Sequence, residues 1–497
     1  MTFDPREFTG LKRREFLRYL SLAAIAACGG QAGSSTTAGP GATAGPGTTA
    51  APGTTGAPGT TLGGPSTTVG APETQFMDPT VGLSGDLRIL LWSHFVPAHD
   101  TWFDPFVQDW ASQVGINVTV DHINVADIPA RISSEISAGE GHDLIQYIAP
   151  LSQFEPSVVD MADVTEEAVN RWGEQLSLSQ RSSSNPNTGK YYAYSPGWVP
   201  DPGDYRGSLW ETAGFPNGPA TWDELLEGGS SIFADQGVQM GIGMSQEIDS
   251  NMAGRALLWS FGGSIQDENE TVTINSQQTV EAVTFMKELF EGAMTDEVFA
   301  WTAASNNQGL ISGELSYILN SISAYRTSQE ANPEVADDTF FIPALSGPAA
   351  QLVASHVMYN WIVPNHAANV DAAKEFLLHY TLNYESACWH SQLYDFPAFA
   401  ERVPNLETWV SSDPFGSQPA DKLSVLSDAL DWSTNVGHPG PANPATGQIF
   451  AESIIPVMYA EAARGDKTPE QAVTDAETKI NAIYAEWREA GLVGGES

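Results

Sequence analysis

Aromatic and hydrogen-bonding side chains follow two of the segments that are predicted to be buried strands. Trp92, Ser93 and His94 come after the first apolar run of the globular part, and Tyr147 ends the third. In open α/β sheets, ligands bind beyond the carboxyl ends of the strands. A flat aromatic face can stack on the C–H face of a sugar ring, and Asp, Asn and His side chains can fix its hydroxyl groups. These four residues are therefore candidate ligand contacts.

Further candidates lie in a segment with helical spacing. Asp249 begins it and could face a ligand, although a role as helix cap is the interpretation that we favour. Trp259 lies in the same segment and could belong either to the core or to the site. Other tryptophans, Trp110, Trp222 and Trp487, fall within helix patterns and are predicted to pack in the core.

Motifs of common enzymes are missing from the sequence, which has no His-Glu-x-x-His, Gly-x-Ser-x-Gly or Walker motif. His94 and His99 are five positions apart, whereas a metal-binding pair on one helix face is four apart. Cys28 and Cys388 are the two cysteines, too few for a cysteine-based zinc or iron–sulfur site. We therefore expect no catalysis, metal or cofactor, although two carboxylates that cleave glycosides remain open among 61 acidic residues.

The candidate residues need a scaffold, and the apolar pattern supplies one. Apolar runs at 87–92, 116–123 and 142–147 are typical of strands, and helical spacing lies between them, which predicts a parallel α/β sheet. The pattern restarts downstream. There we expect helices at 221–225 and onward, 249–261, 279–290, 372–380 and 468–487, and strands at 315–320, 338–344 and 358–363. This is too many elements for one sheet and indicates two α/β lobes.

Several short motifs occur in a characteristic order: Ser137-Ala-Gly-Glu-Gly-His-Asp143, Lys190-Tyr-Tyr-Ala-Tyr-Ser-Pro196, Gly214-Phe-Pro with Ala220-Thr-Trp-Asp-Glu-Leu225, Gly262-Gly263, and Ile311-Ser-Gly-Glu-Leu-Ser-Tyr-Ile-Leu-Asn320. Together they resemble the extracellular solute-binding proteins of ABC importers, in the maltose-binding-protein-like group that takes sugars. His142 departs from the pattern, because proline is usual at this position.

The resemblance implies a periplasmic-binding-protein-like fold, with two hinged lobes and a ligand cleft between them. Lobe one would comprise residues 85–193 and 340–390, and lobe two residues 197–336 and 394–490. Lobe closure over the ligand would create the surface that an ABC permease recognises.

The resemblance also implies ligand contacts. Tyr194 and Trp198 flank Pro196 at a predicted crossover, which borders the cleft. Asn320 ends a strand whose family counterpart leads into the site, and Tyr325 matches an aromatic position of sugar-binding relatives. Trp361 lies in a segment that often lines the cleft.

The first 28 residues are predicted to be an export signal. Arg13 and Arg14 resemble the twin-arginine motif, and the apolar run 19–27 is too short to span a membrane. The run ends in Ile25-Ala-Ala-Cys28, which resembles a bacterial lipobox with Cys28 as the lipid attachment point. The alternative is an ordinary secretory signal with an incidental cysteine. We expect a protein that is anchored outside the cytoplasmic membrane.

A low-complexity stretch follows the signal. Residues 29–72 are almost wholly Gly, Ala, Pro, Ser and Thr and carry no charge. Such a segment has too little apolar surface to offset the entropy lost on ordering. We therefore predict a disordered tether over residues 29–80.

The charge balance limits the partners. There are 61 acidic and 21 basic residues, a formal net charge of −40, which argues against nucleic acid and anionic lipid surfaces as partners. The first hypothesis is therefore a lipid-anchored, monomeric sugar-binding subunit of an ABC importer. Two alternatives stay open, namely the same fold with a polyamine or other small cation as ligand, and an extracellular carbohydrate-active enzyme.

Overall fold

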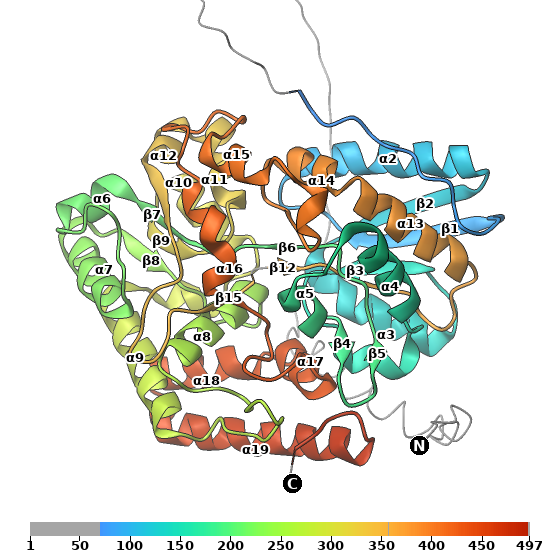
Figure 1. The fold of residues 1–497 in the computed structure, drawn as a ribbon. Coiled ribbons are helices and arrows are strands. Elements are labelled where there is room, and N and C mark those ends of the chain that lie inside the picture. The colour runs from blue at the N-terminus through green and yellow to red at the C-terminus, as the bar shows by residue number, and fades with distance from the viewer. Residues whose placement is uncertain (1–69, 356, 496–497) are drawn as a thin grey trace, which may run out of the picture.

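The computed structural model describes residues 70–355 and 357–495. The predicted export signal, its Cys28 and most of the predicted tether lie outside the described residues. The described chain folds into two α/β lobes that lie side by side, with thin strands crossing between them (Figure 1). The predicted fold class is confirmed.

The sheet of lobe one has the order β13-β3-β1-β2. Its strands β1 (Asp86–Trp92), β2 (Asn117–Ile123) and β3 (Leu144–Tyr147) are parallel, and β13 (Asn360–Ile362) runs antiparallel to β3. The apolar runs had predicted the three parallel strands. Their carboxyl ends lie at one edge of the sheet, next to Ser93 and Tyr147.

Helices α2 (Pro97–Val114), α3 (Ile128–Ala138) and α13 (Val370–Leu382) belong to this lobe. Rings of α2 and α13 form an aromatic core: Phe103 lies 6.0 Å from Phe376 and 5.6 Å from Tyr380, measured between centroids. Buried aromatic side chains contribute large apolar areas, so this core holds α2 in place. The position of α2 matters because its first turn carries His99.

The sheet of lobe two has the order β10-β7-β9-β8. The strands are β7 (Gly203–Arg206), β8 (Gln239–Gly241), β9 (Leu315–Leu319) and β10 (Thr339–Ile342). Around them lie α7 (Trp222–Gln236), α8 (Ile248–Ser260), α9 (Gln277–Ala293) and α10 (Ser305–Ser312). At the start of α7 the Thr221 hydroxyl accepts from the Glu224 N–H. The Glu224 carboxylate accepts from the Ala220 N–H, one residue earlier than a capping box requires.

A third small sheet joins the lobes. Its central strand β6 (Gly197–Val199) pairs antiparallel with β12 (Val357–Met358) on one side and with β14 (Phe396–Pro397) on the other. The outer crossovers therefore lie at β6 and just before β14.

The middle crossover lies elsewhere than predicted. Lobe one was expected to resume at residue 340, yet β10 pairs along its whole length with β7 of lobe two. The chain reaches the crossover sheet only at β12 and the first sheet at β13. The predicted boundary is too early because an apolar strand pattern does not reveal which sheet the strand joins. We keep the two-lobe division as a proposal with this boundary moved.

The chain ends in α17 (Pro444–Ala451), α18 (Ile454–Ala463) and α19 (Pro469–Glu489) (Figure 1). A capping box begins α19, since Thr468 and Gln471 exchange hydrogen bonds. Its buried face carries Val473, Ile480 and Tyr484, as the helical spacing predicts.

Shorter elements connect these parts. They are η2 (Val125–Asp127), η3 (Ser152–Ser157), α4 (Ala162–Trp172), α5 (Ser177–Arg181), β4 (Ser184–Asn185), β5 (Lys190–Tyr191), α6 (Gly207–Thr212), η4 (Asp296–Phe299), α11 (Ser323–Ala331), α12 (Pro333–Asp338), β11 (Val353–Ala354), α14 (Tyr384–His390), η5 (Ala400–Arg402), α15 (Leu406–Ser411), η6 (Ser424–Asp428), α16 (Ala429–Trp432) and β15 (Ser433–Thr434). Within the described ranges, every helix is too short or too polar to cross a bilayer.

The last residues of the predicted tether pack against the head. Asn383 exchanges two hydrogen bonds with the backbone of Gln75, with distances of 2.7 and 2.9 Å, and the Thr80 N–H donates to Glu375 at 3.0 Å. Phe76 lies 6.0 Å from His379 of α13. The predicted end of the tether at residue 80 is therefore too late, because Gln75–Thr80 has both apolar side chains and backbone partners on α13.

His142, the departure from the family pattern, bridges two elements of lobe one. Its ring nitrogens lie 2.7 Å from the Glu135 carboxylate and 2.9 Å from that of Asp121. Burial favours a lower pKa for His142, but these two hydrogen bonds outweigh it and the pKa is raised. Burial favours a higher pKa for Glu135, yet the bonds from His142 lower it.

We expect the His142→Gln substitution to lower the melting temperature in a pH-dependent manner. A raised histidine pKa stabilises the fold fully below the ordinary value of 6.5 and loses that effect as pH rises through the folded-state pKa. Glu135 loses its contribution as pH falls through its lowered pKa. The melting difference should therefore be largest at about pH 5–6 and shrink towards pH 9.

The matched control is His390→Gln, because burial lowers the pKa of His390 and its pH dependence has the opposite sign. Calorimetric melts from pH 4 to 9 measure both. A His142→Gln difference that stays constant over this range would contradict the assignment.

Candidate functional site

Three rings are stacked where lobe one meets the crossover sheet. His94 lies between Trp92, at a centroid distance of 4.9 Å, and His99, at 4.3 Å, with interplanar angles of 25° and 21°. Trp92 ends β1, His94 lies in the following loop, and His99 is in the first turn of α2. Both faces of the His94 imidazole are therefore covered by other rings.

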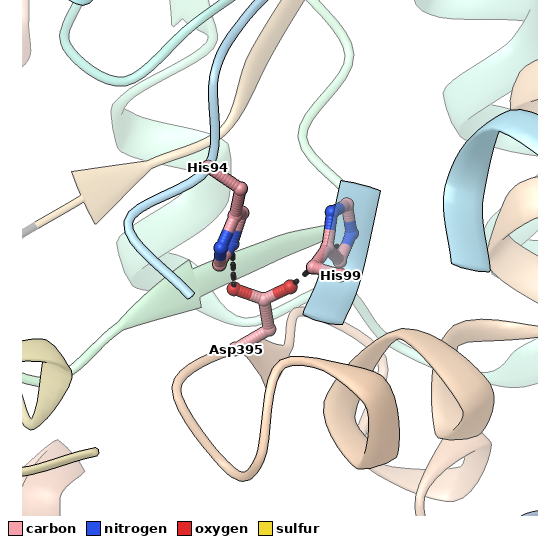
Figure 2. Close-up of side chains that lie close together, drawn as sticks. All are labelled: His94, His99 and Asp395. Atoms are coloured by element: carbon pink, nitrogen blue, oxygen red, sulfur yellow. Dashed lines mark hydrogen bonds and ion pairs between the residues drawn. The ribbon is translucent and has the colours of Figure 1, made fainter. Parts of the chain in front are cut away.

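Asp395 faces both histidines from the loop before β14 (Figure 2). Its Oδ1 is 3.3 Å from His94 Nε2, and its Oδ2 is 3.7 Å from His99 Nε2. The Tyr359 hydroxyl donates to the same Oδ1 at 2.5 Å. All four residues are buried, so this group of side chains is shielded from solvent in the conformation described.

The burial has electrostatic consequences. It lowers the pKa of His99, and the neighbouring His94 acts in the same direction. Burial also raises the pKa of Tyr359, and the negative charge of Asp395 adds to this effect. Tyr359 is therefore a hydrogen-bond donor throughout the physiological range of pH.

A second polar group belongs to lobe two. The Asn306 side chain donates to Asp249 Oδ2 at 3.0 Å, which connects α10 to the start of α8. Asn307 donates to the Ser323 hydroxyl at 3.1 Å and accepts from the Asn320 amide. These residues come together because α10 and the turn after β9 lie side by side.

Tyr394 connects the two groups. Its ring packs edge-on against His94 at 5.1 Å. Burial raises the pKa of its hydroxyl, the hydrogen bond with Ser321 opposes this, and the charges of Asp395 and Asp249 add to the rise. Tyr394 thus lies within electrostatic reach of carboxylates from both parts. We name the following set the interlobe polar layer: His94, Asp249, Asn306, Asn307, Asn320, Ser321, Tyr359, Tyr394 and Asp395.

The structure brings some predicted site residues together in this layer. Asn320 and Asp249 belong to its lobe-two side, and His94, stacked on Trp92, belongs to its lobe-one side. Ser93 is exposed and Tyr147 half-buried at the carboxyl edge of the first sheet, where a ligand could reach both.

Asp249 is not the helix cap that the sequence favours. The N-cap of α8 is Glu247, whose carboxylate accepts from the backbone N–H groups of Asp249 and Ser250. The helix starts one residue earlier than predicted, so the Asp249 side chain is available for Asn306 instead.

Three predicted contacts pack in the lobe-one core or the crossover sheet. Trp361 is fully buried among Phe103, Phe376 and Tyr380, with ring centroids 6.0–6.4 Å away. The Tyr194 hydroxyl is bonded to Thr381 at 2.7 Å. Trp198, in the central strand β6, packs edge-on against Phe396. We leave these three residues out of the candidate site because no ring face is left for a ligand.

Two predicted contacts pack inside lobe two. The Tyr325 hydroxyl donates to Ser417 at 2.8 Å, and its ring lies edge-on to Phe341. Trp259 is 4% exposed and packs against His438. Both are large buried side chains and serve the core.

Asp395, Tyr394 and Tyr359 are not found from the sequence, because they lie next to very short strands without a recognisable pattern. The spacing of five positions between His94 and His99 does not match a pair on one helix face, so it gives no signal for His99 either. The stack forms because His94 precedes α2, so the loop geometry, not the helical period, sets the distance between the two rings.

A hollow of about 450 Å³ lies on lobe two, lined among others by Trp301, Gln308 and Leu315. Leu315 begins β9, whereas Asn320 follows its other end. The hollow is therefore at the opposite edge of the sheet from the interlobe polar layer.

Comparisons with solved structures agree with the two-lobe geometry. An oligosaccharide periplasmic-binding protein from Synechococcus sp. MITs9220, in complex with zinc, matches with a TM-score of 0.69 and 19% identity, over 81% of this chain and 100% of that one. Maltose-bound MalE3 of T. maritima matches with a TM-score of 0.66 and 18% identity, over 80% of this chain and 100% of that one. These similarities show the fold.

Sequence comparison gives a curated Brucella abortus (strain 2308) protein described as a binding protein, 26% identical over 142 residues. The match covers 28% of this chain and spans about a third, 34%, of that relative. A family model for the bacterial extracellular solute-binding proteins matches residues 102–415, which is more than half of the chain. The protein belongs to the bacterial extracellular solute-binding proteins, the family that its motifs resemble.

Proposed function

We propose that this protein binds a sugar or oligosaccharide between its lobes and delivers it to an ABC permease. The observation that carries the proposal is the interlobe polar layer, in which side chains from both lobes and a crossover converge. A ligand that contacts both sides would favour the closed arrangement by its differential affinity for it.

The chemistry of the layer suits a polyhydroxylated ligand. The carboxylate of Asp249 can accept hydrogen bonds from hydroxyl groups, and the amides of Asn306 and Asn320 can both donate and accept. Ser93 and the Tyr147 ring, at the edge of the first sheet, provide a hydroxyl and an aromatic surface. The structural neighbours that carry a sugar name or ligand, among them maltose-bound MalE3, support the same class.

A second candidate is a small cationic ligand such as a polyamine. One observation favours it: the pKa of Tyr394 is raised first by burial and then by the charges of Asp395, Asp249 and Asp201. The carboxylate of Asp204, also buried, has a raised pKa because of burial and the charge of Asp201. The carboxylates of Asp201, Asp249 and Asp395 would attract a cation, whereas the raised pKa of Asp204 favours its neutral form.

We also propose that the protein is exported and held by a lipid on Cys28. The basis is the signal pattern of residues 1–28. The bound form would then meet its permease at the outer face of the cytoplasmic membrane, as the family membership suggests.

The ligand class is tested by calorimetric titration of the protein with sugars and polyamines. We expect a sugar to bind, and the Asp249→Asn substitution to weaken it about tenfold or more, because a hydrogen bond to a charged group contributes about 1.5–3 kcal/mol. The control is Asp235→Asn, an equal charge change at an exposed position of α7. Equal weakening in both variants, or unchanged affinity in Asp249→Asn, would contradict the proposed site.

Salt dependence separates the two candidate ligand classes. Affinity for an uncharged sugar should change little between 50 and 500 mM NaCl, roughly 13 and 4 Å in Debye length, whereas affinity for a polyamine should fall clearly. Titrations of the best ligand at both salt concentrations measure this. Binding that is confined to polyamines and weakens with salt would replace the sugar proposal by the cationic one.

The lipid anchor is tested in cells. Cys28→Ser should move the protein from the membrane fraction to the soluble extracellular fraction, because Cys28 is the proposed attachment point. Cys388→Ser is the matched control, since this buried thiol of α14 is remote from processing and should leave the protein on the membrane. Membrane retention of the Cys28→Ser protein would overturn the anchor.

A further inference from the structure

The side chains of His94, His99 and Asp395 present ligand atoms of the kind that divalent transition metals prefer. One ligand atom from each of the three lies within 4.8 Å of the other two. Zinc bonds of about 2.0–2.1 Å to nitrogen and oxygen place neighbouring tetrahedral ligands roughly 3.4 Å apart. The separations of 3.3 and 3.7 Å between the histidine nitrogens and the carboxylate oxygens are close to this spacing.

The hydrogen bonds around the group leave its inner atoms for a cation. His99 Nδ1 lies 3.4 Å from Asp100 Oδ1, and a carboxylate only accepts, so Nδ1 carries a proton. His99 Nε2 lies 3.5 Å from the Tyr380 hydroxyl and 3.7 Å from Asp395 Oδ2, which is buried and has no hydrogen-bond donor among the described residues. A divalent cation between Nε2 and Oδ2 would be attracted by the carboxylate oxygen and would bind the nitrogen lone pair.

Neighbouring groups support such a site. Asp100 holds His99 by its outer nitrogen, which is how carboxylates orient histidine ligands in metal sites. His94 Nδ1 accepts from the Val96 N–H at 3.0 Å and lies 3.1 Å from the Val96 carbonyl oxygen, to which it would donate when Nε2 binds a metal; Nε2 points to Asp395. The Tyr359 hydroxyl, 3.3 Å from His94 Nε2, donates to Asp395 Oδ1 and so orients this carboxylate. Figure 2 shows the carboxylate between the two rings.

We propose that His94, His99 and Asp395 form a binding site for a zinc ion or a similar divalent transition metal. The donor set favours zinc over calcium or magnesium, since two imidazole nitrogens suit zinc and the hard cations prefer oxygen. The metal fastens the loop before β14, which is a crossover between the lobes, to the start of α2 in lobe one. It is a structural tie at the hinge and is distinct from the sugar contacts of lobe two.

The test is zinc binding to the full chain without sugar, after chelation and buffer exchange. We expect about one zinc per chain to survive gel filtration, and a melting temperature that rises with zinc. His94→Gln and His99→Gln should each weaken zinc binding at least tenfold, and Asp395→Asn should do the same. His142→Gln is the matched control, because this histidine also contacts two carboxylates but lies outside the group, and its zinc content should equal that of the unmodified protein.

A second measurement uses the unmodified protein, so it tests the proposal even if the variants do not fold. Cobalt(II) bound to the unmodified protein should give the intense visible absorption of a tetrahedral site with nitrogen and oxygen ligands, displaced by one equivalent of zinc. Failure of the folded, unmodified protein to retain zinc, or equal zinc content in the His94→Gln, His99→Gln and unmodified proteins, overturns the proposal. Because sugar titrations are run separately, this failure is distinguishable from failure of the sugar proposal.

Discussion

The arrangement of the molecule depends on the pairing of β6 with both β12 and β14. Gly197 in β6 makes this possible, because a Cβ at this position would overlap the Tyr384 hydroxyl and press on the Phe396 carbonyl. The close approach fixes the register of the three crossover strands. Tyr394 and Asp395 directly precede β14, so this register also determines that both side chains point at the histidine stack. The crossover sheet therefore positions both the hinge and the candidate site.

Burying the carboxylates of the interlobe polar layer costs free energy of folding, because they lose their hydration. Only good hydrogen bonds or a positive charge can replace that hydration. On the lobe-two side, the Asn306 amide supplies part of that compensation by donating to Asp249. On the lobe-one side, the Tyr359 hydroxyl donates to Asp395 Oδ1, and the proposed metal ion would compensate Oδ2. A binding protein gains from such an arrangement, since a ligand that completes the hydrogen bonds shifts the equilibrium between open and closed lobes.

Patterns in the sequence predicted the first sheet and the main helices, because each has a long apolar period and clear caps. Gly139 and Thr468 mark ends that the structure confirms. The predicted site was less accurate, since a period shows that Trp361 faces inward but does not distinguish a core from a cleft. Distances across the hinge, such as that from His94 to Asp395, depend on tertiary pairing over 301 positions and have no local signal. For the same reason, the sequence does not reveal which sheet β10 joins.

The contact of Gln75–Thr80 with α13 and the residue that follows it has a mechanical consequence. The chain enters the head on lobe one, so a force transmitted from the preceding residues acts on that lobe alone. Lobe two is joined to it only through the crossover strands and the packing between the lobes. If the preceding residues are anchored as proposed, lobe one is the held lobe and lobe two the lobe that moves on closure. The crossover strands then lie outside the path of the force.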